Sequence, residues 1–128
     1  MKQVQETDFM LYEKDDGILK AKYKPGVFVN LKAAKQIVAD RLRFTGKEDL
    51  VVLIYDDGIT NIDREARVYL ASKEANKHIK AGVIINKSPV TSVVGNFFIK
   101  LNKPAIPCKL FSSEQKAVKW LTENFLEN

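Results

Sequence analysis

Six consecutive apolar residues, "LVVLIY" at positions 50–55, constrain the fold more than any other part of the sequence. A strand in which every side chain is apolar needs cover on both faces, as in a parallel sheet between layers of helices. The run is far shorter than the ~20 residues that a membrane-spanning helix needs. We therefore expect a buried β-strand at residues 50–55 that is covered on both faces.

The rest of the chain predicts an alternation of strands and helices. Further strands are expected at residues 8–14, 18–24, 82–86 and 107–111. Helices are expected at residues 31–44, at 64–79 with a break near Ser72, at 89–102, and after an N-cap at Ser112. The dipeptide Asp16-Gly17 predicts a hairpin turn between the first two strands, and residues 24–30 are expected to form a connection.

This order predicts one α/β domain over residues 1–128. It consists of an N-terminal β-hairpin followed by alternating α and β elements, which form a largely parallel sheet with helices packed on it. A chain of 128 residues suits a single domain and buries enough surface to form a core without disulfides or metals.

The composition excludes several classes of protein. The net charge of +5 comes from lysines spread along the chain, so we expect no nucleic-acid binding. The single cysteine, Cys108, cannot form a disulfide within the chain and is expected to be a buried, unreactive thiol. His78 is expected near a helix C-terminus. No secretory signal or transmembrane segment is visible, so we expect a cytoplasmic protein, with no cofactor and no metal.

The stretch "YDDGITNIDREAR" at residues 55–67 is the candidate functional site, because it follows the apolar strand and carries four carboxylates. Loops at the carboxyl ends of parallel strands are where α/β sheets bind ligands and partners. The candidate binding residues are Asp56, Asp57, Thr60, Asn61, Asp63 and Arg64. Thr60, Asn61 or Asp63 is also expected to cap the next helix. A phosphoacceptor or cation site that uses Asp56, Asp57 or Thr60 is an alternative.

The order of elements and this stretch resemble the STAS domain, the fold of bacterial anti-sigma factor antagonists. The signature of that family is an apolar strand ending in Asp, a short turn, and Asp-Ser-Ser/Thr-Gly at a helix start. Asp63 falls at the second Asp of the signature, but Tyr55 replaces the strand-ending Asp and Arg64 replaces the phosphoacceptor serine. The chain is similar to divergent, uncharacterised bacterial relatives with STAS or Sec14-like folds. The resemblance implies a STAS-like fold without the usual phosphoacceptor.

We expect a non-enzymatic regulatory or protein-interaction module that binds a protein partner or self-associates. The helix expected at 89–102 carries more apolar side chains than one sheet face needs, so Phe97, Phe98 and Ile99 are candidate interface residues. Gly95 in the same helix predicts a close backbone approach. The alternative is a protein that binds a small apolar ligand or lipid, because the Sec14-like relatives bind lipids.

Overall fold

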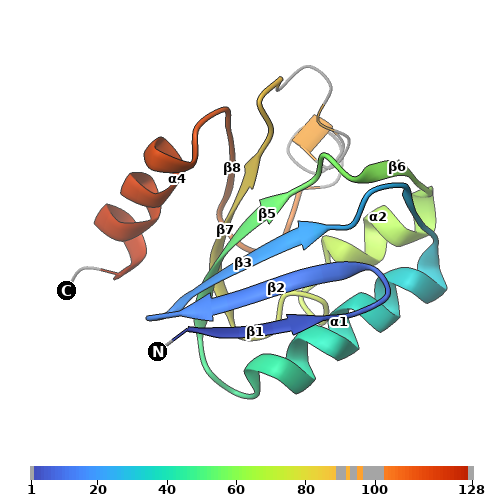
Figure 1. Cartoon of the computed structure of the whole chain (residues 1–128), viewed down its shortest axis with the longest axis horizontal. Helices are drawn as coiled ribbons and strands as arrows, with labels where there is room; N and C mark the ends of the chain where they lie inside the picture. The colour runs from blue at the N-terminus through green and yellow to red at the C-terminus, as the bar shows by residue number, and fades with distance from the viewer. Residues whose placement is uncertain (1, 89–91, 93–94, 97–102, 127–128) are drawn as a thin grey trace.

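The chain folds into a mixed sheet with helices on both faces in this computed structural model, which describes residues 2–88, 92, 95, 96 and 103–126. The main sheet of the described part has six strands in the order β1-β2-β3-β5-β7-β8 (Figure 1). They are β1 (Gln3–Glu6), β2 (Met10–Asp15), β3 (Ile18–Tyr23), β5 (Leu50–Tyr55), β7 (Ile79–Ile85) and β8 (Cys108–Phe111). The first three strands pair antiparallel, and β3, β5, β7 and β8 pair parallel. The predicted hairpin and largely parallel sheet are confirmed.

Helices lie against both faces of the parallel part of the sheet. On one face lie α1 (Leu31–Thr45) and α2 (Arg64–Leu70). On the other lies α4 (Glu114–Leu121), which continues into the π-helical turn η2 (Thr122–Leu126) (Figure 1). In the described part of the chain, no helix is long and apolar enough to cross a membrane.

The central strand β5 separates two apolar cores, as its composition predicts. Leu50 and Val52 face the core under α1 and α2, whereas Val51 and Leu53 face the core under α4. All four side chains are buried. Because full burial of one Val or Leu side chain contributes about 1.5–3 kcal/mol, β5 stabilises both layers at once.

A second, two-stranded sheet lies where the sequence predicts only a connection and a turn. β4 (Val27–Val29) pairs parallel with β6 (Ile59–Ile62). The expectation of a plain connection at 24–30 is therefore wrong. Each of the two strands has only three or four residues, with apolar side chains inward and polar or aromatic side chains outward. An alternation this short cannot be recognised in the sequence of one strand alone. Strand β1 was missed because its side chains are mostly exposed.

Gly58 allows the chain to turn from β5 into β6. A Cβ atom at this position would clash with the backbone carbonyl oxygens of Tyr23 and Lys24 at the end of β3. The Val27 N–H donates to the Gly58 carbonyl at 3.1 Å, which ties this turn to the start of β4. Backbone proximity of this kind leaves room for glycine alone.

The expected helix at 64–79 ends at Leu70, close to the expected break near Ser72, but no helix follows the break, and residues 71–78 form turns. Side-chain donors replace the backbone N–H groups that would bond to the last carbonyls in a longer helix. Ser72 Oγ donates to the Tyr69 carbonyl at 2.6 Å, and Asn76 Nδ2 donates to the Leu70 carbonyl at 2.9 Å. Strand β7 then begins at Ile79 rather than at residue 82. The expected place of His78 near a helix C-terminus is also wrong. It lies in a turn with a φ of 66°, and its Nδ1 is 3.1 Å from Oδ1 of Asp49.

One expectation in the C-terminal half differs in detail, and another is mostly untested. The N-cap of α4 is Ser113 rather than Ser112, because Ser113 Oγ accepts the Lys116 N–H at 3.4 Å. Most of the helix expected at 89–102 lies outside the described residues. Gly95, which is described, makes the close approach expected of it, since a Cβ there would lie 2.6 Å from Ser92 Oγ.

Replacing Gly58 with alanine tests the contact between the β5–β6 turn and the end of β3. We expect Gly58→Ala to lower the free energy of unfolding by about 1–3 kcal/mol, because the new methyl forces rigid backbone apart. Chemical denaturation measures this change. The matched control is Asp57→Ala, an exposed neighbour, which should change it by less than about 0.5 kcal/mol. Equal stability of the two variants would contradict the proposed contact.

Candidate functional site

The first residue of the candidate stretch, Asp56, lies inside the protein rather than on its surface. Its side chain is 2% exposed. Asn86 Nδ2 donates to Asp56 Oδ1 at 2.8 Å, and Ser92 Oγ donates to Asp56 Oδ2 at 2.7 Å. Asp56, Asn86 and Ser92 form what we call the Asp56 network. Burial and the charge of Asp56 together raise the pKa of Tyr23 above its ordinary value.

The Asp56 network connects the carboxyl ends of β5 and β7 to the segment that follows β7. Asn86 Oδ1 accepts the Ser88 N–H at 2.8 Å, and Ser92 Oγ accepts the Gly95 N–H at 3.0 Å. A buried carboxylate is tolerable when hydrogen bonds satisfy it. The network therefore holds this edge of the sheet together, and Asp56 is unsuited to contact a partner directly. Sequence reasoning missed Asn86, although a polar residue directly after a buried strand is a recognisable signal.

Three other candidates hydrogen-bond to the local backbone. Asp63 is the N-cap of α2, and its Oδ1 accepts the Ala66 N–H at 3.0 Å. Thr60 Oγ1 donates to the Val27 carbonyl at 3.0 Å, across the β4–β6 pair. Asn61 Oδ1 accepts the Ile62 N–H at 2.9 Å. Of the three possible caps, Asp63 is the one that caps α2.

The outer side of the stretch presents a mixed polar and apolar surface. Asp57, Thr60, Asn61 and Arg64 are exposed. Phe28, which is 49% exposed, pairs with Asn61 in the β4–β6 sheet. Val68, which is 52% exposed, follows Arg64 by one helical turn. Sequence reasoning missed Phe28 and Val68, because their exposure depends on strand β4 and on where α2 ends.

The carboxylates of the stretch do not assemble into a cation site. In residues 2–88 and the described segments after them, no group of three or more His, Cys, Asp or Glu side chains is placed to hold a metal ion. Asp56 faces Asn86 and Ser92, whereas Asp63 caps α2. The candidate interface residues Phe97, Phe98 and Ile99 lie outside the described residues, so their role stays a prediction.

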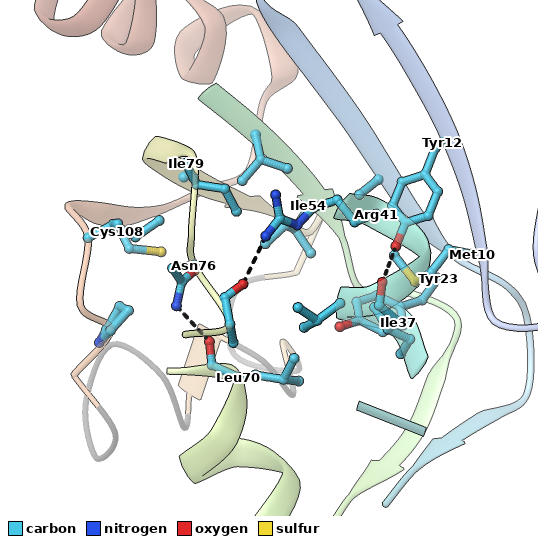
Figure 2. Close-up of a pocket in the computed structure, with 17 residues that line it drawn as sticks. Met10, Tyr12, Tyr23, Ile37, Arg41, Ile54, Leu70, Asn76, Ile79 and Cys108 are labelled. Carbon is cyan, nitrogen blue, oxygen red and sulfur yellow. Dashed lines mark hydrogen bonds between the residues drawn. The ribbon is translucent and has the colours of Figure 1, made fainter. Parts of the chain in front are cut away.

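A separate cavity lies between the sheet and the α1 side of the core. Its volume is about 80 Å³. Side chains from β2, β3, β5, α1 and the segments around β7 and β8 line it, and Arg41 lies in the middle of them (Figure 2). The sequence places Arg41 on the apolar face of α1 through its aliphatic stem, but the spacing of residues does not show the cavity that its head group reaches.

The polar groups around the cavity are neutral apart from Arg41. Tyr12 Oη donates to the Ile37 carbonyl at 3.2 Å, and burial raises the pKa of this phenol. Cys108 is half-buried rather than fully buried as expected. Burial raises the pKa of its thiol to about 11, so this thiol is protonated at pH 7, and its expected lack of reactivity stays a prediction. The cavity wall thus combines apolar and neutral groups with one guanidinium.

Asp56→Asn tests the structural role of the network. The asparagine keeps the shape of the side chain but offers one acceptor oxygen instead of two, so one of the two donors loses its partner. We expect a loss of about 1–3 kcal/mol in the free energy of unfolding and faster hydrogen exchange at the Ser88 and Gly95 amides. Asp57→Asn is the matched control and should change neither quantity. Unchanged exchange in Asp56→Asn would contradict the role assigned to the network.

Comparison with solved structures agrees with the fold. One match is the crystal structure of an uncharacterised protein of the DUF3478 family with a SpoIIAA-like fold, from Shewanella loihica PV-4. It has a TM-score of 0.50 and 15% sequence identity, and the match covers 94% of this chain and 92% of that chain. At this identity the match establishes the fold alone. The predicted STAS-like architecture, which is the SpoIIAA-like fold, is confirmed.

Comparison with families and with curated proteins gives one further result. No curated protein matches the sequence significantly. The family described as a domain of unknown function, DUF7793, matches residues 12–124, which is most of the chain. The chain therefore belongs to the DUF7793 family.

Proposed function

We propose that this protein is a non-enzymatic regulatory module that binds a protein partner through one surface. We call it the docking surface and define it by the six exposed residues Phe28, Asp57, Thr60, Asn61, Arg64 and Val68. The observation that carries the proposal is the position of two exposed apolar side chains, Phe28 and Val68, beside this charged stretch. Interfaces often combine a small apolar centre with a polar rim.

Backbone hydrogen bonds and buried side chains hold the segment beneath the docking surface in place. The Asp63 N–H donates to the Val29 carbonyl at 3.0 Å, and the Ile59 N–H donates to the Asp56 carbonyl at 3.2 Å. Ile59 and Ile62 are buried in the core under α1 and α2. A surface that is ordered before binding loses less conformational entropy when a partner binds, which favours a recognition role for this segment.

The chemistry of the segment favours binding over phosphoryl transfer. Arg64 occupies the position at which the resemblance to STAS domains implies a phosphoacceptor hydroxyl, and a guanidinium cannot accept a phosphoryl group. Asp56 is buried with hydrogen bonds to both carboxylate oxygens. Thr60 and Asp57 are exposed, and among the described residues no group of three or more His, Cys, Asp or Glu side chains is placed to hold a metal ion beside them.

A second candidate function, the binding of a small apolar ligand, is favoured by the cavity around Arg41. Sites for drug-sized ligands usually enclose about 300–1,000 Å³, whereas this cavity encloses about 80 Å³. Its volume therefore favours a ligand of a few non-hydrogen atoms over a lipid.

Two substitutions test the docking surface. We expect Phe28→Ser and Arg64→Glu each to reduce partner capture from a native extract at least tenfold, measured by quantitative mass spectrometry of proteins retained by the tagged chain. Arg64→Glu should not harm folding, because a carboxylate at the first turn of a helix interacts favourably with its dipole.

The control for this experiment is Leu11→Ser. Leu11 is another exposed apolar residue, but it lies on the sheet face opposite to Tyr12, which faces α1. A partner that is lost in both docking-surface variants and kept by Leu11→Ser supports the proposal. If every retained protein is kept equally by all three variants, the docking surface is wrong.

A further inference from the structure

Arg41 is a buried cation without a carboxylate partner among the described residues. Its residue surface is 6% exposed. Its Nη2 donates to the carbonyls of Ala75 and Lys77 at 3.0 and 3.1 Å, but its Nη1 is buried and has no hydrogen-bond partner in the described part of the chain. Burial lowers the pKa of Arg41, and the groups whose charge opposes this effect are the phenols of Tyr12 and Tyr69. Phenols are neutral at pH 7, so they leave the positive charge uncompensated.

The carboxylate next to Arg41 in the sequence is directed elsewhere. Asp40, the residue before Arg41 on α1, accepts from Gln36 Nε2 at 2.8 Å and from Arg43 Nη1 at 3.4 Å. An unpaired charge inside a protein is costly unless a counter-ion or several hydrogen bonds compensate it. The two backbone carbonyls compensate Arg41 in part, and an anion in the adjoining cavity would complete the compensation.

Beside Arg41 and the neutral polar groups of Tyr12, Tyr23, Asn76 and Cys108, the wall of the cavity is mainly aliphatic. Aliphatic side chains from four parts of the fold line the cavity together with Arg41, among them Ile37, Ile54 and Ile79 (Figure 2). Ile106 also lines it. Such a wall favours a carbon chain over a hydrated inorganic ion, because the ligand must leave water to enter. The volume of about 80 Å³ is roughly half that of the 150 Å³ engineered cavity that holds benzene, which limits the ligand to a short chain.

We propose that this cavity binds a short-chain organic monocarboxylate, with the carboxylate at the Arg41 guanidinium and the hydrocarbon chain against the aliphatic wall. A carboxylate suits this position because a guanidinium presents donors whose geometry matches two carboxylate oxygens. The site is distinct from the docking surface, and binding here does not depend on the proposed protein partner.

Titration of the whole chain with sodium butyrate tests the site directly. The chain is labelled at isoleucine δ1 methyl groups, and NMR spectra are recorded at pH 7 in chloride-free buffer at constant ionic strength. We expect saturable shifts at the methyls of Ile37, Ile54, Ile79 and Ile106. Butyramide, which has the same size but no charge, should bind at least tenfold more weakly.

Variants of two arginines on α1 provide the matched comparison. Arg41→Met should weaken butyrate binding at least tenfold, and replacement of a buried charge by an apolar side chain of similar volume is often tolerated by the fold. Arg43→Met removes a largely exposed arginine two residues away and should leave binding unchanged.

Three results would overturn the proposal. The first is the absence of saturable shifts at these methyls. The second is equal affinity for butyrate and butyramide, which needs only the native chain and therefore decides the question even if Arg41→Met fails to fold. The third is binding of chloride to the same site with an affinity equal to that of butyrate. Such a result would show that the hydrocarbon chain contributes nothing to binding.

Discussion

Burial of β5 from both sides is the constraint on which the rest of the structure depends. Its side chains alternate between two apolar cores, so the strand must lie inside a sheet with helices on each face. In this fold, β5 pairs parallel with β3 on one side and with β7 on the other. The carboxyl ends of β5 and β7 therefore meet at one edge, where Asp56 and Asn86 share a hydrogen bond.

The acidic stretch after β5 acquires two different roles from this arrangement. Its first residue turns inward and joins the Asp56 network, which ties the strand ends to the segment after β7. The residues that follow form β6, pair with β4, and lead into the α2 cap at Asp63. Buried hydrogen bonds and strand pairing thus support a surface whose charged and apolar side chains remain exposed. The proposed binding role rests on this arrangement.

Much of the fold could be predicted from the sequence, because long periodic segments carry strong signals. The doubly buried strand at 50–55, the hairpin and the helix at 31–44 all follow from apolar spacing. The pair β4–β6 could not be predicted, since Val27–Val29 and Ile59–Ile62 are each too short to show a period and become strands only against each other. For the site, the role of the segment after β5 stays a prediction. The inward turn of Asp56 could not be predicted, because it depends on Asn86 and Ser92. The cavity beside Arg41 depends on residues from several distant elements.

Residues 56–63 support the proposed docking surface through the β4–β6 strand pair rather than as an irregular loop. Native-state hydrogen exchange of the backbone amides tests this most directly. The amides of Val27, Ile59 and Asp63 donate within the β4–β6 region. We expect them to exchange as slowly as the amides of β5, close to the limit set by global unfolding. Exchange of these three amides at the rate of an exposed loop, while β5 stays protected, would contradict it.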